Sequence, residues 1–270
     1  MENVIWADTD GQSLSVSDRG VNYGDGCFTT MLVENGQINL FKRHQDRMTD
    51  SLDVLAIPNV DVRGLFQHLH RSIAAVSGKQ VLKLVITRGS GGRGYSPEGC
   101  ECPTIIVSQS AWPVHYEDWQ KNGIELGLCP FQLGWSVLAG IKHLNRLEQV
   151  MVKNAIKGMA EQDAIVTDLE GNVVETSASN IFWRKENTVY TPELSKAGVK
   201  GVMRAEVISI LDRLGYEVKE VLCPVEVIYG ADEVFITNAL MERVPVNRLG
   251  QTVYTERFAL DAVNSELHLC

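Results

Sequence analysis

The sequence predicts an α+β protein built from two domains. Its 270 residues are 44% hydrophobic and 22% charged, which is enough apolar material for two modest cores. Runs of β-branched residues alternate with amphipathic helical patterns along the chain. The segment 111–116, A-W-P-V-H-Y, separates two such series and is typical of a crossing between domains. We therefore expect a smaller α/β domain at 1–113, a linker at 114–122 and a larger α/β domain at 123–270.

The N-terminal segment 4–16 has two short strand-like runs around the turn residues Asp10-Gly11, which predicts a hairpin. A glycine-rich bend after Asp18 then leads into a strand that ends near Val33. Side chains alternate along a strand, so Phe28 and Thr30 are expected on one face and Thr29 on the other. Thr30 is our candidate for a catalytic hydroxyl and Phe28 for a substrate contact.

Two amphipathic helices, at 41–55 and 62–75, are expected before a buried strand at 81–87. Arg43 and Arg47 lie one turn apart on the first helix. Such a pair can hold an anion, and a solvated helix face is the alternative.

The strand at 81–87 runs into the loop R-G-S-G-G-R-G-Y-S-P at 88–97. The loop lacks the G-K-[ST] ending of a phosphate-binding Walker loop. Its glycines allow a close approach of the backbone to a ligand, and the guanidinium of Arg93 is suited to a carboxylate. A flexible surface loop is the alternative. A further strand is expected at 104–108.

The second half is expected to contain more strands than helices. A strand, a Glu-Gly-Asn turn and a returning strand are expected across 164–175, with Glu175 on the returning strand. A helix is expected to start at Gly201 and to place the amides of Val202 and Met203 where helix N-termini bind phosphate. The remaining expectations are strands at 124–128, 181–183, 217–222 and 233–237 and helices at 224–229 and 254–267.

Lys142 lies in the stretch L-A-G-I-K-H-L-N-R-L-E-Q-V-M-V at 138–152. Apolar residues recur there at helical spacing, at Leu144, Leu147, Val150 and Met151. This pattern predicts a helix that starts at or just after Lys142 and turns its apolar face into the core. Partial desolvation would lower the pKa of the amine and favour the neutral form that attacks a carbonyl cofactor. An ordinary surface lysine is the alternative.

Charge and cysteine usage exclude several classes of protein. A net charge of -9 and a pI near 5.2 argue against nucleic-acid binding, since phosphate recognition needs a concentrated basic face. We find neither a secretory signal nor an apolar run long enough for a membrane span, so a cytoplasmic protein is expected. The C-E-C pair at 100–102 is too tightly spaced for zinc, and no metal is expected. A redox pair is the alternative to reduced structural thiols, which we expect at Cys27, Cys100, Cys102, Cys129, Cys223 and Cys270.

Six segments in one order resemble the fold-type IV pyridoxal-phosphate enzymes. They are Y-G-D-G at 23–26, H-Q-D-R at 44–47, T-R-G at 87–89, I-K-H-L-N-R-L at 141–147, V-V-E-T-S-A-S-N-I-F at 173–182 and G-V-M-R at 201–204. This family contains branched-chain and D-amino-acid aminotransferases and aminodeoxychorismate lyases. The resemblance implies a two-domain fold like that of the D-amino-acid aminotransferases and pyridoxal 5'-phosphate as cofactor.

The resemblance also implies roles for matching residues. Lys142 would bind the cofactor aldehyde covalently and then move protons, while Glu175 would keep the pyridine nitrogen protonated. The phosphate would be bound by Arg47, by the amides of Val202 and Met203, and by the turn Thr237-Asn238-Ala239. In the D-amino-acid aminotransferases a partner subunit lends an arginine and a histidine to the substrate carboxylate. That pattern reads Arg93 and Tyr95 here, so the arginine is kept and the histidine is replaced.

Three segments, at 25–30, 86–96 and 138–150, are most similar to the lyase branch of the family. The resemblance therefore implies a homodimeric lyase of folate biosynthesis that converts 4-amino-4-deoxychorismate to p-aminobenzoate and pyruvate. A branched-chain or D-amino-acid aminotransferase of the same fold is the alternative. A non-catalytic ligand-binding protein on this scaffold is a third possibility, which an absorption band of the bound cofactor would exclude.

Overall fold

The computed structural model describes residues 4–7 and 13–267, and these form two compact units. Unit 1 holds the described residues up to Trp112 together with Lys142–Asn145. Unit 2 holds Pro113–Ile141 and the described residues from Arg146 onward. The domain boundaries drawn from the sequence stay a prediction.

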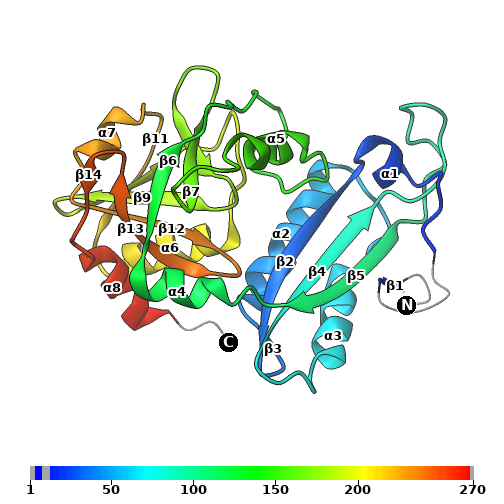
Figure 1. Cartoon of the computed structure of the whole chain (residues 1–270). Helices are drawn as coiled ribbons and strands as arrows, with labels where there is room; N and C mark the ends of the chain where they lie inside the picture. Colours follow the sequence, from blue (N-terminus) through cyan, green and yellow to red (C-terminus); the bar gives the residue numbers. More distant parts are fainter. Residues whose placement is uncertain (1–3, 8–12, 268–270) are drawn as a thin grey trace. The chain divides into compact units, whose positions relative to one another are not determined.

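Unit 1 is a mixed sheet covered by two helices (Figure 1). The strand order is β1-β5-β4-β2-β3, with β1 parallel to β5 and the other pairs antiparallel. The strands are β1 Val4–Trp6, β2 Gly26–Glu34, β3 Gln37–Ile38, β4 Lys79–Thr87 and β5 Thr104–Ala111. The helices are α1 Arg19–Tyr23, α2 Phe41–Val54 and α3 Val62–Ser72.

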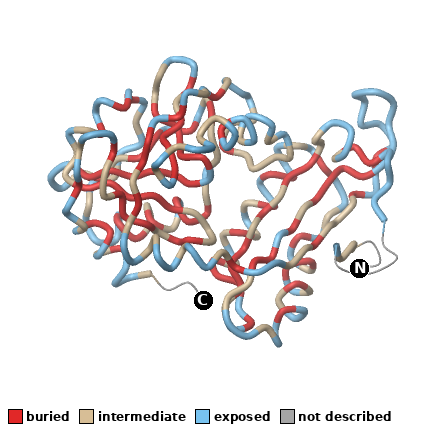
Figure 2. The backbone as a smooth tube through the Cα atoms, in the orientation of Figure 1, coloured by how far each residue is buried: buried red, intermediate tan, exposed pale blue. Residues whose placement is uncertain are grey.

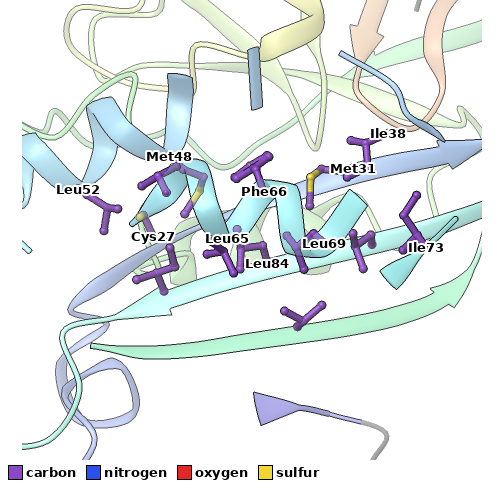
Figure 3. Packing of buried hydrophobic residues seen from close by; sticks show 14 of the residues in the cluster. Cys27, Met31, Ile38, Met48, Leu52, Leu65, Phe66, Leu69, Ile73 and Leu84 are labelled. Atoms are coloured by element: carbon purple, nitrogen blue, oxygen red, sulfur yellow. The ribbon is translucent and has the colours of Figure 1, made fainter. Parts of the chain in front are cut away.

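The core of unit 1 lies between the sheet and the helices α2 and α3 (Figure 3). Met48 and Leu52 of α2 and Phe66 of α3 are buried against Cys27 and Met31 of β2. Burial of a side chain of this size contributes about 1.5–3 kcal/mol. The strands β2 and β4 are therefore largely buried, whereas the loop that follows β4 is exposed (Figure 2).

Unit 2 is built on a larger sheet, with the order β11-β10-β9-β12-β13-β6-β7-β8 and β14 paired to β13. Its strands are β6 Ile124–Leu128, β7 Asp163–Thr167, β8 Val173–Thr176, β9 Asn180–Lys185, β10 Thr188–Pro192, β11 Glu217–Val221, β12 Glu233–Asn238, β13 Glu242–Leu249 and β14 Thr252–Val253. Its helices are α4 His115–Asn122, α5 Leu147–Ala155, α6 Val202–Arg213, α7 Glu226–Tyr229 and α8 Phe258–Glu266. None of the helices in the described residues has the length and apolar character needed to cross a membrane.

The structure corrects the expected hairpin at 4–16. Residues 8–12, which include its turn, lie outside the described residues, and the second run is not a strand. β1 pairs instead in parallel with the distant strand β5, with Ile5 opposite Ile106. The turn residues Asp10-Gly11 suggested that β1 pairs with the run that follows them. The longer apolar strand β5 instead offers β1 more backbone hydrogen bonds and buries more of its side chains.

The expected start of the Lys142 helix is also wrong. α5 begins at Leu147, five residues later, and Leu147, Val150 and Met151 are exposed rather than buried in the core. Helical periodicity identified the helix but not the environment of its apolar face. The sequence also missed two helices, α1 and α4, and four strands, β3, β10, β13 and β14, of which β13 contains Pro245, a residue that argues against a strand.

Candidate functional site

Lys142 lies on a short segment that runs along the start of β2. The Phe28 N–H donates to the Lys142 carbonyl at 3.0 Å, and the Leu144 N–H donates to the Gly26 carbonyl at 3.0 Å. Gly26 permits this approach, because a Cβ there would lie 2.8 Å from a Leu144 side-chain carbon and 2.4 Å from the Ile86 carbonyl oxygen. Backbone pairing therefore fixes Lys142 beside Phe28.

The Lys142 ammonium lies over the Phe28 ring, with Nζ 4.7 Å from the ring centroid. The Nζ of Lys83 lies 5.1 Å from the same centroid. Lys83 is directly opposite Thr30 in the β2–β4 register, so Phe28 and Thr30 share one face of β2 as expected. Two candidate residues, Phe28 and Thr30, thus occupy the strand face that carries these ammonium groups.

The opposite face of β2 carries a buried polar group around Thr29. The Thr29 Oγ1 lies 2.6 Å from His44 Nδ1 and accepts a hydrogen bond from Arg47 Nη2. Because this hydroxyl accepts from Arg47, it can donate its own hydrogen to the neutral imidazole. Burial, with smaller contributions from the charges of Arg47 and Lys142, holds the pKa of His44 well below its usual value. The neutral ring and the hydroxyl orient the guanidinium of Arg47.

The buried guanidinium of Arg47 keeps its charge and has unfilled hydrogen-bonding capacity among the described residues. Burial lowers its pKa to about 10, which leaves the guanidinium charged at neutral pH. Its Nε is buried and has no hydrogen-bond partner among the described residues. An unsatisfied buried donor on a cation is costly, so a ligand with acceptor oxygens would remove that cost.

Unit 2 connects Glu175 to the start of α6 through Asn180. The Val199 N–H donates to Glu175 Oε2 at 3.0 Å, and Asn180 Nδ2 donates to the Val199 carbonyl at 2.8 Å. The Gly201 N–H, at the start of α6, donates to Asn180 Oδ1 at 3.1 Å. A Cβ on Gly201 would lie 2.2 Å from that oxygen, so glycine is required for the contact. One asparagine therefore aligns a buried carboxylate with a helix N-terminus.

The first turn of α6 and the neighbouring strand β12 contain polar groups for which the described part of the chain shows no hydrogen-bond partner. Val202 and Met203 are the first residues of α6, and no side chain caps this helix in the described part of the chain. First-turn amides have no acceptor within their own helix. Thr237 is paired with Asn180 across β12 and β9, and its buried hydroxyl also lacks a partner in the described residues. Amides at a helix N-terminus and hydroxyl groups are the kinds of donor that bind anions in proteins.

Asn238 and Ser177 extend this region of unit 2. Asn238 Oδ1 accepts from the Leu240 and Met241 N–H groups, each at 2.8 Å, so this residue mainly shapes the turn. The Ser177 Oγ is buried and has no partner among the described residues. Arg146 lies near Glu175: burial lowers its pKa, and the charge of Glu175 opposes that shift.

Arg93 and Tyr95 lie on a different element, the exposed loop between β4 and β5. Tyr95 is 87% exposed and its ring lies 5.5 Å from that of Tyr23, measured between centroids. The side chains of Arg93 and Tyr95 are therefore accessible to a ligand or to a second chain.

The site residues that the sequence did not single out are Thr29, His44, Asn180, Ser177 and Arg146. Asn180 stands within the V-V-E-T-S-A-S-N-I-F segment, so an asparagine directly before the apolar run Ile181-Phe182-Trp183 was the available signal. The cysteines in the described residues are free thiols, and those residues contain no group of three His, Cys, Asp or Glu side chains suited to a metal.

The sequence profile of the amino-transferase class IV family matches residues 26–249. The chain belongs to the class IV aminotransferase family. This class IV chain is 40% identical to the aminodeoxychorismate lyase of Vibrio harveyi over 233 residues, which cover 86% of each chain. It is 32% identical to a putative branched-chain-amino-acid aminotransferase of Methanocaldococcus jannaschii, with 90% of this chain and 85% of that protein covered.

Among solved structures, the class IV chain is similar to the 4-amino-4-deoxychorismate lyase of Pseudomonas aeruginosa. The TM-score is 0.88 at 35% identity, and the match covers 95% of this chain and 96% of the other. The expectation of an α+β, fold-type IV architecture is therefore confirmed.

Proposed function

We propose that this chain is a pyridoxal-phosphate-dependent lyase that converts 4-amino-4-deoxychorismate to p-aminobenzoate and pyruvate. The observation that carries the choice of reaction is the likeness to two lyases of that name, one of them 40% identical over 86% of both chains. The family description and the relative at 32% identity keep an aminotransferase as the alternative. The polar groups of the site support a phosphorylated cofactor in either case.

The residues present fit pyridoxal 5'-phosphate. Arg47 offers a cation whose buried Nε has no hydrogen-bond partner in residues 4–7 and 13–267, and the start of α6 offers the first-turn amides of Val202 and Met203. Thr237 adds a hydroxyl without a partner in the described residues. A phosphate supplies the acceptor oxygens that these donors need. We propose that they bind the cofactor phosphate and that Asn238 keeps the turn after Thr237 in shape.

The cofactor would be attached to a lysine through its aldehyde, and once the amine of the substrate replaces that lysine, it would withdraw electrons from the substrate carbon that bears the amine. Lys142 would provide that attachment and then take the proton from C4 of the substrate. Glu175, buried and oriented by the Val199 amide, would hold the proton on the pyridine nitrogen. Loss of the C4 proton expels the enolpyruvyl group, which gains a proton and leaves as pyruvate, while the ring becomes aromatic.

The substrate carries two carboxylates, so cations are needed around it. Phe28 would contact the ring of the substrate, and Thr30, on the same face of β2, would act as a catalytic hydroxyl. We propose that Arg93 and Tyr95 bind a substrate carboxylate in the site of a second copy of this chain, because both are exposed on their own chain. The exposed apolar side chains of α5, at Leu147, Val150 and Met151, support a homodimer.

Two further points complete the proposal. A net charge of -9 and a site built for a small molecule support an enzyme without a nucleic-acid partner. Free thiols at the described cysteines support a reducing compartment, so we place the enzyme in the cytoplasm.

A product assay tests the reaction. The purified protein is incubated with the cofactor and 4-amino-4-deoxychorismate, and separately with branched-chain or D-amino acids plus 2-oxoglutarate. We expect stoichiometric p-aminobenzoate and pyruvate, with much slower amino transfer. Amino transfer that equals or exceeds lyase turnover would favour the alternative. No turnover of any substrate and no absorption band of bound cofactor would indicate a ligand-binding protein.

The shared site has its own test. Mixing an Arg93→Ala chain with a Lys142→Ala chain under conditions of subunit exchange should give heterodimers with one intact site, and so restore activity that neither variant shows alone. Recovery should approach about a quarter of the activity expected for the same amount of wild-type sites, since random exchange makes about half of the dimers mixed and each mixed dimer has one intact site of two. A fully active monomer, or exchange without recovery, would contradict the shared site.

A further inference from the structure

Arg19 directs a buried guanidinium at a single loop. The residue is 4% exposed, and its Nε donates to Asp25 Oδ2 at 2.9 Å. Its Nη1 donates to the carbonyls of Gly94 at 3.0 Å and Ser96 at 3.2 Å, and its Nη2 donates to the Tyr95 carbonyl at 3.1 Å. One side chain therefore holds three consecutive carbonyls of the loop between β4 and β5.

The loop backbone is shaped to make these contacts. Gly92 has φ +68°, and a Cβ there would lie 2.1 Å from the Ser96 carbonyl oxygen and 3.2 Å from Arg19 Nη1. The Arg19 N–H also donates to the Gly89 carbonyl at 2.9 Å, so the loop is held at its start as well. The backbone of 89–96 is thus fixed around Arg19, although the side chains of this loop are largely exposed.

Asp25 keeps Arg19 in place. It lies between Arg19 and Arg88, whose Nε donates to the same Oδ2 at 2.8 Å. Burial alone would raise the pKa of Asp25, but the hydrogen bonds from Arg88 and Arg19 outweigh it and lower the pKa. The Nη1 and Nη2 groups of Arg88 donate to the carbonyls of Ala56 and Leu55, which follow the end of α2. The two arginines share one carboxylate but hold different parts of the chain.

We infer that Arg19 is a positioning residue for carboxylate recognition. Gly94 lies between the exposed residues Arg93 and Tyr95, and Arg19 holds the carbonyls of Gly94 and of Tyr95 itself. Because Arg19 already fixes this backbone, the loop loses little further conformational entropy when Arg93 binds a carboxylate. The inference rests on the proposed function, because it assigns the loop to the substrate carboxylate.

The direct test is Arg19→Lys, with Arg88→Lys as the matched control. A lysine retains the charge beside Asp25 but lacks the planar fork that reaches three carbonyls. We expect Arg19→Lys to raise the KM for aminodeoxychorismate about tenfold, with kcat within about twofold and the absorption band of the bound cofactor unchanged. Arg88→Lys loses the same kind of buried contact and should leave KM within about twofold of wild type.

A double-mutant cycle asks whether Arg19 acts through Arg93. In an Arg93→Ala background, Arg19→Lys should add less than about twofold to KM, because the group that it positions is already absent. A full tenfold effect in that background, or equal KM changes for Arg19→Lys and Arg88→Lys, would overturn the inference.

Hydrogen exchange supplies a readout that does not depend on activity. The amides of 93–96 should exchange faster in Arg19→Lys than in wild type, whereas Arg88→Lys should leave them unchanged. Gly92→Ala disturbs the same contacts from the loop side and should show the same local increase if Arg19→Lys folds poorly. Unchanged exchange in both Arg19→Lys and Gly92→Ala would sink the inference even if wild type is an active lyase. Loss of the proposed function would instead appear as an inactive wild type with the exchange differences intact.

Discussion

Two polar regions of the molecule differ in how their hydrogen bonds are completed. Around the loop that follows β4, the buried Asp18 carboxylate accepts from the Gly20 N–H and from the hydroxyls of Thr87 and Thr104. Around the start of α6, the hydroxyls of Ser177 and Thr237 are equally buried but have no partner among the described residues. The Asp18 carboxylate of the first region is hydrogen-bonded within the protein, whereas the second region contains buried hydroxyls that have no hydrogen-bond partner in the described residues.

This difference distinguishes polar groups that stabilise the fold from polar groups that can bind a ligand. A buried polar group without a partner costs free energy, so such groups persist where a ligand supplies the missing partner. Burial alone does not distinguish the two regions, because Asp18 and Thr237 are both fully buried. The unfilled hydrogen-bonding capacity supports our proposal that the second region binds the cofactor phosphate, and four experiments test the proposed site in order of expected effect.

The largest effect is expected from Lys142→Ala. Removal of the amine deletes both the covalent attachment and the proton carrier, so turnover should fall by roughly 10³-fold or more. The control is Lys83→Ala, which removes the other ammonium over the Phe28 ring and should retain the covalently bound cofactor. Borohydride reduction followed by peptide mapping measures the attachment. Labelling at Lys83, or near-normal turnover of Lys142→Ala, would remove Lys142 from its role.

Glu175→Gln should reduce kcat by about 10²-fold while weakening cofactor affinity far less, because the carboxylate controls a proton rather than the phosphate. Glu170→Gln, on the exposed turn before the same strand, is the control and should be close to wild type. Steady-state kinetics and cofactor titration by absorbance give the two quantities. A fully active Glu175→Gln enzyme would mean that another group protonates the pyridine.

Thr237→Val and Thr87→Val compare the two regions directly. The Thr87 hydroxyl donates to Asp18 at 2.9 Å and accepts from the Gly89 N–H at 3.0 Å, so its loss should destabilise the fold by about 1–3 kcal/mol. The Thr237 hydroxyl has no partner to lose among the residues that the structure describes, so Thr237→Val should leave the cofactor-free protein equally stable or more stable. Urea unfolding of both variants without cofactor measures the difference. Equal destabilisation would erase the contrast between the regions.

The smallest effect is a pH dependence that comes from His44. Burial keeps its folded pKa well below the ordinary value of 6.5, so below that pH the unfolded chain binds a proton that the folded chain refuses. Stability should therefore fall as the pH drops through 6.5, by at most about 1.4 kcal/mol per pH unit. His44→Gln should flatten this part of the profile of the cofactor-free protein. An identical slope in both proteins would show that His44 does not contribute.

Much of the fold was predictable because its signals are local. The sequence predicted α2, α6 and the β7–β8 hairpin with bounds close to those observed, from apolar periodicity and from a Glu-Gly-Asn turn. β1 failed because its partner β5 is about a hundred residues away, and nothing local specifies a parallel pairing. α5 was recognised from its spacing, but spacing does not reveal whether an apolar face is covered by this chain.

The site was predictable where a residue type carries its own chemistry. Lys142, Glu175 and Arg47 stand out as an amine, a carboxylate and a guanidinium in ordered motifs, and their assigned roles stay predictions. Asn180 and Arg19 did not stand out, because their importance lies in which backbone groups they reach. Those partners are distant in sequence and become visible only in the folded chain.

The most direct measurement of the account is the affinity for the cofactor with and without its phosphate. Pyridoxal 5'-phosphate and pyridoxal are titrated by absorbance into wild type, Thr237→Val and Thr87→Val. We predict that the phosphate improves affinity in wild type by about 10²-fold or more, that Thr237→Val loses roughly tenfold of this gain, and that Thr87→Val keeps it. Equal affinities for the two compounds in wild type would contradict the claim that the unfilled donors, including the Thr237 hydroxyl, bind the cofactor phosphate. An equal loss of the phosphate-dependent gain in affinity in both variants would contradict it as well.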